Sequence, residues 1–168
     1  MAIQRIAVLG AGQMGNGITQ VAAAAGYDVI MIDIEQEYVD KGLATIQRSL
    51  TKLVSKERMS QEDADATLAR ISLATDRSVC ADCDLVVEAV PEILDLKTSI
   101  FAELDGICKP ETILASNTSS ISISTIANAT NRPDRVIGMH FMNPVPIMKL
   151  VEVINGDKTS TETNAAVI

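Results

Sequence analysis

Apolar residues along the chain alternate between short continuous runs and longer stretches with helical spacing. The short runs predict buried strands at residues 3–9, 27–33, 70–75, 84–90, 112–116, 135–141 and 148–154. Stretches with the spacing of amphipathic helices cover residues 14–25, 95–108 and 122–130. Strands that alternate with helices predict an α/β fold with a mostly parallel sheet, covered on both faces.

A longer helical segment, residues 36–70, separates the second and third predicted strands. Its apolar stripe consists of Leu43, Ile46, Leu50, Leu53 and Val54. The segment turns near Ser60, where the letters SQED have the N-cap and first-turn acids of a second helix. We therefore expect a helical hairpin inserted after the second strand.

The end of the chain also has a helical signal. Residues 159–168 begin like a capped helix and stop at Ile168 before three turns are complete. No internal repeat and no low-complexity linker divides the sequence. We expect one domain over residues 1–168, truncated at its C-terminus.

The letters GAGQMG connect the first predicted strand to the following helix. In a dinucleotide-binding fold, Gly10 would allow the tight turn, Gly12 the approach of a pyrophosphate, and Gly15 close packing of helix on strand. The free N–H groups at the helix start would face the anion. We expect this loop, with Gln13 and Met14, to bind a dinucleotide. The alternative is a glycine-rich turn in an unrelated α/β protein.

Asp33 stands at the end of the second predicted strand. A carboxylate at this place can accept hydrogen bonds from both hydroxyls of an adenosine ribose. No Arg follows Asp33 to bind a 2′-phosphate, which favours NAD over NADP. The alternative is an acid that merely ends a strand.

The only histidine, His140, lies at the end of the predicted strand 135–141, just before the letters NPVP. Ligands of open parallel sheets bind beyond the carboxyl ends of the strands, so His140 is a candidate proton acceptor. The alternative is a histidine packed in the core.

Glu152 lies between two valines on a strand whose pattern indicates core, where an ionised carboxylate is costly unless paired. We expect it to pair with His140, fix its tautomer and stabilise the imidazolium. The alternative is an exposed edge strand with Glu152 in water.

The letters SNTSS, residues 116–120, follow a predicted strand and precede a short helix. Their hydroxyl and amide groups could bind a substrate oxygen or the nicotinamide ribose. The alternative is that several of these side chains cap the next helix.

Composition narrows the classes of partner. Lys and Arg number 14 against 22 Asp and Glu, and the net charge of −8 opposes binding to nucleic acid or an anionic membrane. No apolar run reaches the roughly 18 residues of a membrane span, and no signal peptide is evident, so we expect a cytoplasmic protein. Cys80 and Cys83 have CxxC spacing, but the chain holds only one other Cys and one His, so we predict no metal site.

Four segments in this order resemble the NAD-binding domain of the short-chain L-3-hydroxyacyl-CoA dehydrogenases: GAGQMGNGITQVAAAAGYDV, DLVVEAVPE, ASNTSS and GMHFMNPVPIMKLVEVI. The resemblance spans the whole chain, and HFMNPVP with the downstream Glu is more specific than the glycine motif. It implies a Rossmann-type doubly wound fold, NAD as cofactor and an acyl-CoA substrate. Family members continue into a helical domain that closes the substrate pocket, supplies a catalytic Asn and forms a homodimer.

The resemblance also implies roles for individual residues. His140 would take the proton of the 3-hydroxyl, with Glu152 orienting it and Ser119 touching the substrate oxygen. The positions that match cofactor contacts are Glu92, Lys97, Ser119 and Asn143. Those that match or neighbour coenzyme A contacts are Ser49, Lys52 and Lys56.

Helical spacing separately places four basic residues on one face: Lys41, Arg48, Lys52 and Lys56. Such a stripe could receive the phosphates of coenzyme A, or it could be a solvated charged face. Two other functions stay open. One is a dehydrogenase of free 3-hydroxy acids, which by resemblance would use a catalytic lysine. The other is a non-catalytic NAD-binding module, and we expect this chain alone to bind NAD with little turnover.

Overall fold

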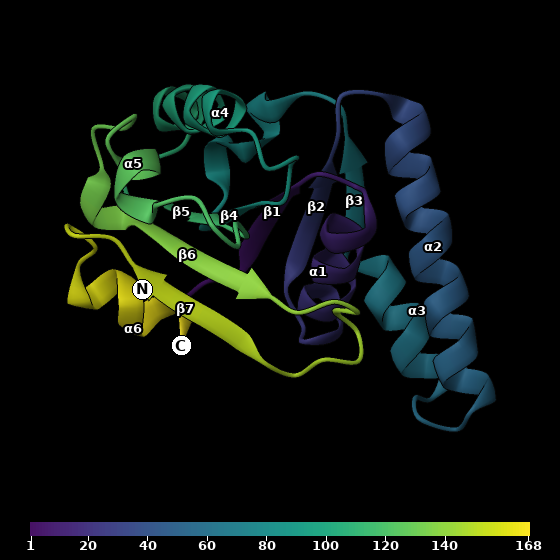
Figure 1. Cartoon of the computed structure of the whole chain (residues 1–168). Coiled ribbons are helices and arrows are strands. Elements are labelled where there is room, and N and C mark those ends of the chain that lie inside the picture. The colour runs from purple at the N-terminus through teal and green to yellow at the C-terminus, as the bar shows by residue number, and fades with distance from the viewer.

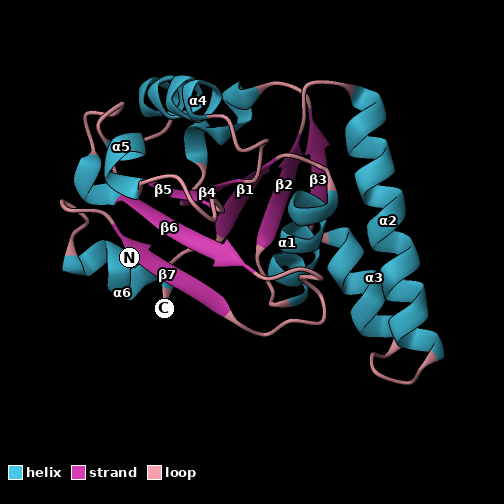
Figure 2. Ribbon diagram, viewed as in Figure 1, coloured by secondary structure: helices cyan, strands magenta, loops and turns pink.

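Seven strands form one sheet in the order β3-β2-β1-β4-β5-β6-β7 (Figure 2). The computed structural model describes all residues, 1–168. The strands are β1 (Arg5–Leu9), β2 (Asp28–Ile32), β3 (Ile71–Ala74), β4 (Leu85–Glu88), β5 (Ile113–Ser116), β6 (Val136–Phe141) and β7 (Val151–Asn155). β1 to β6 are parallel, and β7 pairs antiparallel with β6. The strand order reverses direction between β1 and β4, which is where ligands bind in doubly wound folds.

Six helices surround the sheet (Figure 1). They are α1 (Gln13–Ala24), α2 (Gln36–Ser55), α3 (Gln61–Ala69), α4 (Leu94–Ile107), α5 (Ile123–Ala127) and α6 (Thr161–Val167). Two 3-10 turns, η1 (Arg77–Asp82) and η2 (Pro133–Arg135), complete the chain. No helix combines the length and the apolar character needed to cross a membrane.

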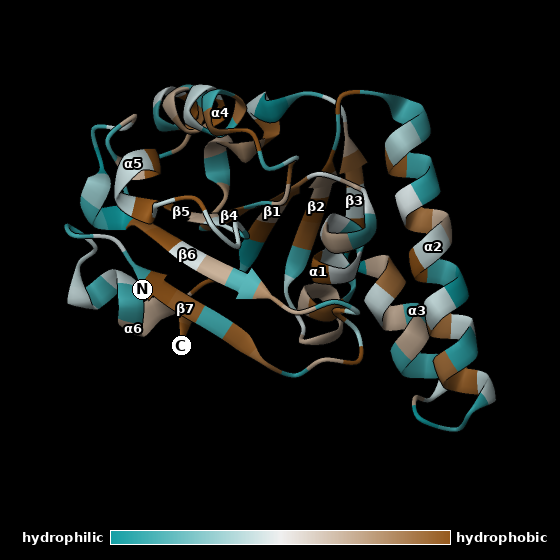
Figure 3. Cartoon of the chain, in the orientation of Figure 1, coloured by the Kyte–Doolittle hydropathy of each residue, from teal (hydrophilic) through white to brown (hydrophobic).

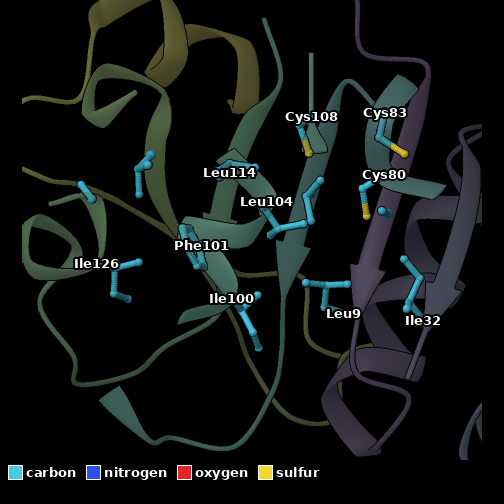
Figure 4. Close-up of a cluster of buried hydrophobic side chains, with 14 of the residues drawn as sticks. Leu9, Ile32, Cys80, Cys83, Ile100, Phe101, Leu104, Cys108, Leu114 and Ile126 are labelled. Carbon is cyan, nitrogen blue, oxygen red and sulfur yellow. The ribbon is translucent and has the colours of Figure 1, made fainter. Parts of the chain in front are cut away.

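Alternating side chains of the strands pack against different helices. Leu9 and Leu114 join one cluster with Phe101 of α4 and Ile126 of α5 (Figure 4). Their neighbours in sequence face the other way, where Ile18 of α1 belongs to a second cluster. Because both faces are covered, the central strands are almost entirely buried and mostly apolar, as the short apolar runs predicted.

The predicted hairpin is α2 and α3, which lie beside α1 at the β3 edge of the sheet (Figure 1). Figure 3 shows α2 in bands of teal and brown, the pattern of a helix with one apolar face. Ile46 and Leu50 on that face are buried with Met31 of β2. Ser60 caps α3 by accepting a hydrogen bond from the Asp63 N–H, as its sequence predicted.

The predicted fold class is confirmed, and element ends shift by a few residues. The turn η1 was not predicted. It carries Cys80, Cys83 follows it directly, and Cys108 is the third free cysteine of the chain. All three are buried in the cluster of Figure 4, and burial raises the pKa of Cys80 to about 12 and that of Cys108 to about 11. These thiols are part of the apolar core.

Candidate active site

The predicted site residues follow the carboxyl ends of neighbouring strands. The glycine loop follows β1, Asp33 follows β2, and Glu92 follows β4. Asn117 follows β5, while His140 lies in the last residues of β6. Since these five strands are parallel, their ends meet at one edge of the sheet.

The three glycines of the loop have different surroundings. Gly10 has a φ of +106°, and a Cβ there would lie 2.5 Å from the carbonyl oxygen of Ala89. A Cβ at Gly15 would overlap the carbonyl oxygen of Gly10. These contacts support the tight turn and the close packing that the motif predicted.

Gly12 is the exception, because a Cβ there would meet no atom within 4 Å. Gly12 is also the N-cap of α1, with no side-chain hydrogen bond to the helix and no acid in the first turn. No side chain therefore accepts a hydrogen bond from the first N–H groups of α1. Such a helix start fits the diphosphate of a dinucleotide.

A fourth glycine, Gly17, packs α1 against the segment after β6. A Cβ at Gly17 would lie 2.8 Å from the Cβ of Val145. The sequence analysis missed this role, because the contact joins residues far apart in the chain.

Asp33 is tied to the glycine loop. Its Oδ2 accepts a hydrogen bond from the Ala11 N–H at 2.8 Å, and its Oδ1 accepts one from the Ile34 N–H at 2.7 Å. It lines a cavity of about 270 Å³ together with apolar Leu9 and Ile32. Four of the ten lining residues are hydrophobic, and a fixed carboxylate beside them fits the ribose hydroxyls of an adenosine.

A second cavity, of about 290 Å³, lies at the end of β6. Its lining includes six of the predicted residues: Met14, Glu92, Lys97, Ser119, His140 and Asn143. Gln13 reaches the same place, donating from Nε2 to Asn143 Oδ1 at 3.1 Å. The structure therefore brings together residues that lie up to 130 positions apart in the sequence.

His140 and Glu152 lie directly opposite each other on β6 and β7. The His140 Nδ1 is 3.5 Å from the Glu152 Oε1, so the two side chains share a face of the sheet as predicted. The reason given for the pairing was wrong, however. β7 is an edge strand, and the side chain of Glu152 is 54% exposed. Strand register brings the two groups together, and burial of the carboxylate does not.

Glu92 links Ser119 to Lys97. Its Oε2 accepts from the Ser119 N–H at 2.9 Å and from the Ser119 hydroxyl at 3.2 Å, while its Oε1 lies 3.1 Å from the Lys97 Nζ. Partial burial opposes ionisation of Glu92. The hydrogen bonds from Ser119 and Thr118, together with Lys97, more than offset this and lower its pKa. Glu92 is therefore a carboxylate at neutral pH.

Sequence reasoning missed Glu88, the last residue of β4. Glu88 is fully buried, and its Oε2 lies 2.6 Å from the Nζ of Lys97, which is 1% exposed. It also accepts hydrogen bonds from the Val90 N–H and the Ser116 hydroxyl. The signal was available, because an acid that ends a buried strand requires a cation and hydrogen-bond donors.

The alternative role for residues 116–120, capping of the next helix, is wrong. The N-cap of α5 is Ser122, whose hydroxyl accepts from the Thr125 N–H. Asn117 instead accepts from the Phe141 N–H at 2.8 Å and so fixes the end of β6 beside His140. Thr118 accepts from the backbone of the turn that follows.

The candidate coenzyme A residues lie elsewhere, on α2 and at its C-terminal end. No residue of α2 lines the cavity around His140. Lys52 lines an open groove on α2 with Arg48, while Lys56 is exposed just after the last helical residue. Ser49 is half-buried, and Lys41 is paired with Glu37 at 2.9 Å.

Comparison with known proteins agrees with this geometry. Residues 5–168 match the family model for the 3-hydroxyacyl-CoA dehydrogenase NAD binding domain. A probable 3-hydroxybutyryl-CoA dehydrogenase of Deinococcus radiodurans is 53% identical over 95% of this chain and 57% of its own length. A 3-hydroxybutyryl-CoA dehydrogenase of Bradyrhizobium diazoefficiens is 50% identical over 96% of the chain and 55% of its own length.

Solved structures give the same result. The crystal structure of (S)-3-hydroxybutyryl-CoA dehydrogenase from Ralstonia eutropha superposes with a TM-score of 0.97 at 48% identity, covering 99% of this chain and 59% of that one. The chain thus spans a little over half the length of these relatives. It belongs to the 3-hydroxyacyl-CoA dehydrogenase family and comprises that family's NAD-binding domain.

Proposed function

We propose that this chain is the cofactor-binding part of a dehydrogenase that interconverts a short-chain L-3-hydroxyacyl-CoA and its 3-oxoacyl-CoA. The observation that carries the proposal is the His140–Glu152 pair. His140 of this pair lines the same cavity as Glu92, Lys97, Ser119 and Asn143. The names of the relatives from Deinococcus and Bradyrhizobium support this choice of substrate.

NAD would be held at two places. The helix start at Gly12 would receive the diphosphate, and Asp33 the adenosine ribose. When bound, NAD supplies the hydride acceptor for C3 of the substrate. The protein's own contribution is to hold the substrate hydroxyl and to move its proton.

His140 is the proposed proton acceptor. Its Nδ1 faces Glu152, so Nε2 is the ring nitrogen left for the substrate hydroxyl. Glu152 keeps the proton on Nδ1 in the neutral ring and stabilises the imidazolium after proton transfer. Ser119 is positioned by Glu92, and its hydroxyl would contact the substrate oxygen.

Ser49, Lys52 and Lys56 would contact coenzyme A. Lys52 and Arg48 line a groove of about 430 Å³ on α2, whose cations suit the phosphates of that carrier. Because the relatives extend well beyond the matched region, we expect the chain by itself to bind NAD and to turn over slowly. Homodimer formation would depend on that further region.

The first test is the exchange His140→Gln, assayed by single-turnover oxidation of NADH with acetoacetyl-CoA and the chain in excess. Loss of a general acid–base is expected to slow the reaction by roughly 10²- to 10⁴-fold. NADH affinity, measured by fluorescence titration, is expected to stay the same. A variant that reacts at the original rate would contradict the role of His140.

The choice of substrate separates the alternatives. Acetoacetyl-CoA is expected to react, while acetoacetate at the same concentration is not. Reaction with both at similar rates would favour a dehydrogenase of free 3-hydroxy acids. Tight NADH binding with no affinity for acetoacetyl-CoA would favour a binding module without catalysis.

A further inference from the structure

We propose that the cluster of Glu88, Lys97 and Glu92 gives the nicotinamide end of the site a net negative charge, which favours the oxidised, cationic ring over the reduced, neutral one. The inference rests on the proposed function, which places that ring in the cavity beside His140. It assigns Glu88 as a positioning residue that acts through Lys97.

The cluster holds one cation between two anions. The Lys97 Nζ lies 2.6 Å from the Glu88 Oε2 and 3.1 Å from the Glu92 Oε1. Glu88 also accepts hydrogen bonds from the Val90 N–H at 2.8 Å and the Ser116 hydroxyl at 2.7 Å. With both acids ionised and the lysine protonated, the cluster carries one negative charge.

This charge lies close to the cavity. Glu92 and Lys97 line it together with His140, and no other acid or base is among the lining residues. Glu152, the carboxylate paired with His140, is half-exposed to water. Glu88 and Lys97 are buried and Glu92 is less exposed than Glu152, so water screens the charges of the cluster less than that of Glu152.

The two redox states of the cofactor respond differently to such a field. The oxidised nicotinamide ring carries a positive charge, whereas the reduced ring is neutral. ADP-ribose lacks the nicotinamide ring altogether. One elementary charge at roughly 10 Å, with an effective dielectric constant of about 20, changes a binding constant by about tenfold. Neutralising Glu88 should therefore weaken binding of NAD⁺ and leave NADH and ADP-ribose nearly unaffected.

The experiment compares variants that differ in cluster charge and in structural damage. Glu88→Gln and Glu92→Gln each leave the cluster neutral. The double variant Glu88→Gln with Lys97→Met loses the buried pair but keeps the single negative charge of Glu92. Ser116→Ala is the matched control, since it removes one hydrogen bond from Glu88 without changing the charge.

Dissociation constants for NAD⁺, NADH and ADP-ribose are measured by calorimetry on the 168-residue chain, at one neutral pH and low salt. The ratio of the NAD⁺ constant to the NADH constant is expected to rise about tenfold in both neutral-cluster variants. It should return to within about twofold of the original in the double variant and stay there in Ser116→Ala.

A ratio that is unchanged in the neutral-cluster variants overturns the proposal, as does one that is most altered in the double variant. If Glu88→Gln fails to fold, as judged by its melting curve, Glu92→Gln and the double variant decide the matter. Glu92→Gln is expected to fold because Glu92 is 38% exposed. The double variant is expected to fold because replacing both members of a buried ion pair is often tolerated. A failure of the proposed function would be recognised in a different experiment, because the His140→Gln variant would then react with acetoacetyl-CoA at the original rate.

Discussion

At the scale of single residues, the glycine loop separates a packing role from a binding role. Gly15 has no room for a side chain, because a Cβ would overlap the Gly10 carbonyl oxygen. Gly12 has room, because nothing lies within 4 Å of the same position. The two residues belong to one motif, yet the structure needs them for different reasons.

Gly12→Ala and Gly15→Ala are therefore expected to fail in different ways. Gly12→Ala should keep its melting temperature and bind NADH at least tenfold more weakly, because the new methyl group occupies the place of the diphosphate. Gly15→Ala should lower the free energy of unfolding by more than about 2 kcal/mol through a backbone clash. Calorimetric melting and NADH titration of both variants test this. Equal stability losses would contradict it.

At the scale of elements, α4 is held at its C-terminus by one side chain. The Arg132 guanidinium donates to the carbonyl oxygens of Asp105, Cys108, Lys109 and Thr112, and its Nε lies 2.6 Å from the Asp105 Oδ1. The ion pair is about nine-tenths buried. α4 also carries Lys97 near its other end, so this cap helps to fix the position of the cluster around Lys97.

Arg132→Met is expected to cost about 3 kcal/mol of unfolding free energy, because it removes the cation paired with the buried Asp105 carboxylate and a hydrogen-bond donor from four carbonyl groups. Arg135→Met is the matched control, since Arg135 makes one exposed bond to the Glu111 carbonyl oxygen. Its cost should stay below about 1 kcal/mol. Urea unfolding of both variants measures the difference, and equal midpoints would rule out the capping role.

At the scale of the whole molecule, acid should unfold the chain through its paired carboxylates. Partial burial opposes ionisation of Asp105, but the Asn131 N–H and Arg132 more than offset it and lower the Asp105 pKa. The pKa values of Glu92 and Asp84 are lowered for similar reasons. A lowered folded pKa stabilises the fold above the unfolded value, and that contribution is lost as the pH falls through the folded value.

Stability is thus expected to be level near neutrality and to fall below about pH 4.5, the range in which unfolded Asp and Glu begin to bind protons. Asp105→Asn should be less stable at pH 7 and should lose less on acidification than the original chain. Urea midpoints between pH 7 and pH 3 test this. Parallel pH curves for the two proteins would exclude Asp105 as a contributor.

The parts of the fold that depend on local pattern were predictable, and those that depend on distant contacts were not. Strand runs, the Ser60 cap and the glycine loop are local signals, and each was found where expected. Gly17 contacts Val145, which lies more than a hundred residues away in the sequence, and no spacing rule predicts that contact. For Glu152 the partner was predicted but the burial was not, because a sequence does not say which strand lies at the edge.

The contact between Gly17 and Val145 affects how the groups for hydride transfer and for proton transfer are positioned relative to each other. One side of it is the helix whose first turn would hold the cofactor's phosphates, and the other is the loop leaving the strand of His140. Because Gly17 and Val145 are in van der Waals contact, this contact sets the distance between the diphosphate site at the start of α1 and the imidazole of His140. A larger residue at position 17 would therefore increase the distance between the bound NAD, which accepts the hydride, and His140, which accepts the proton.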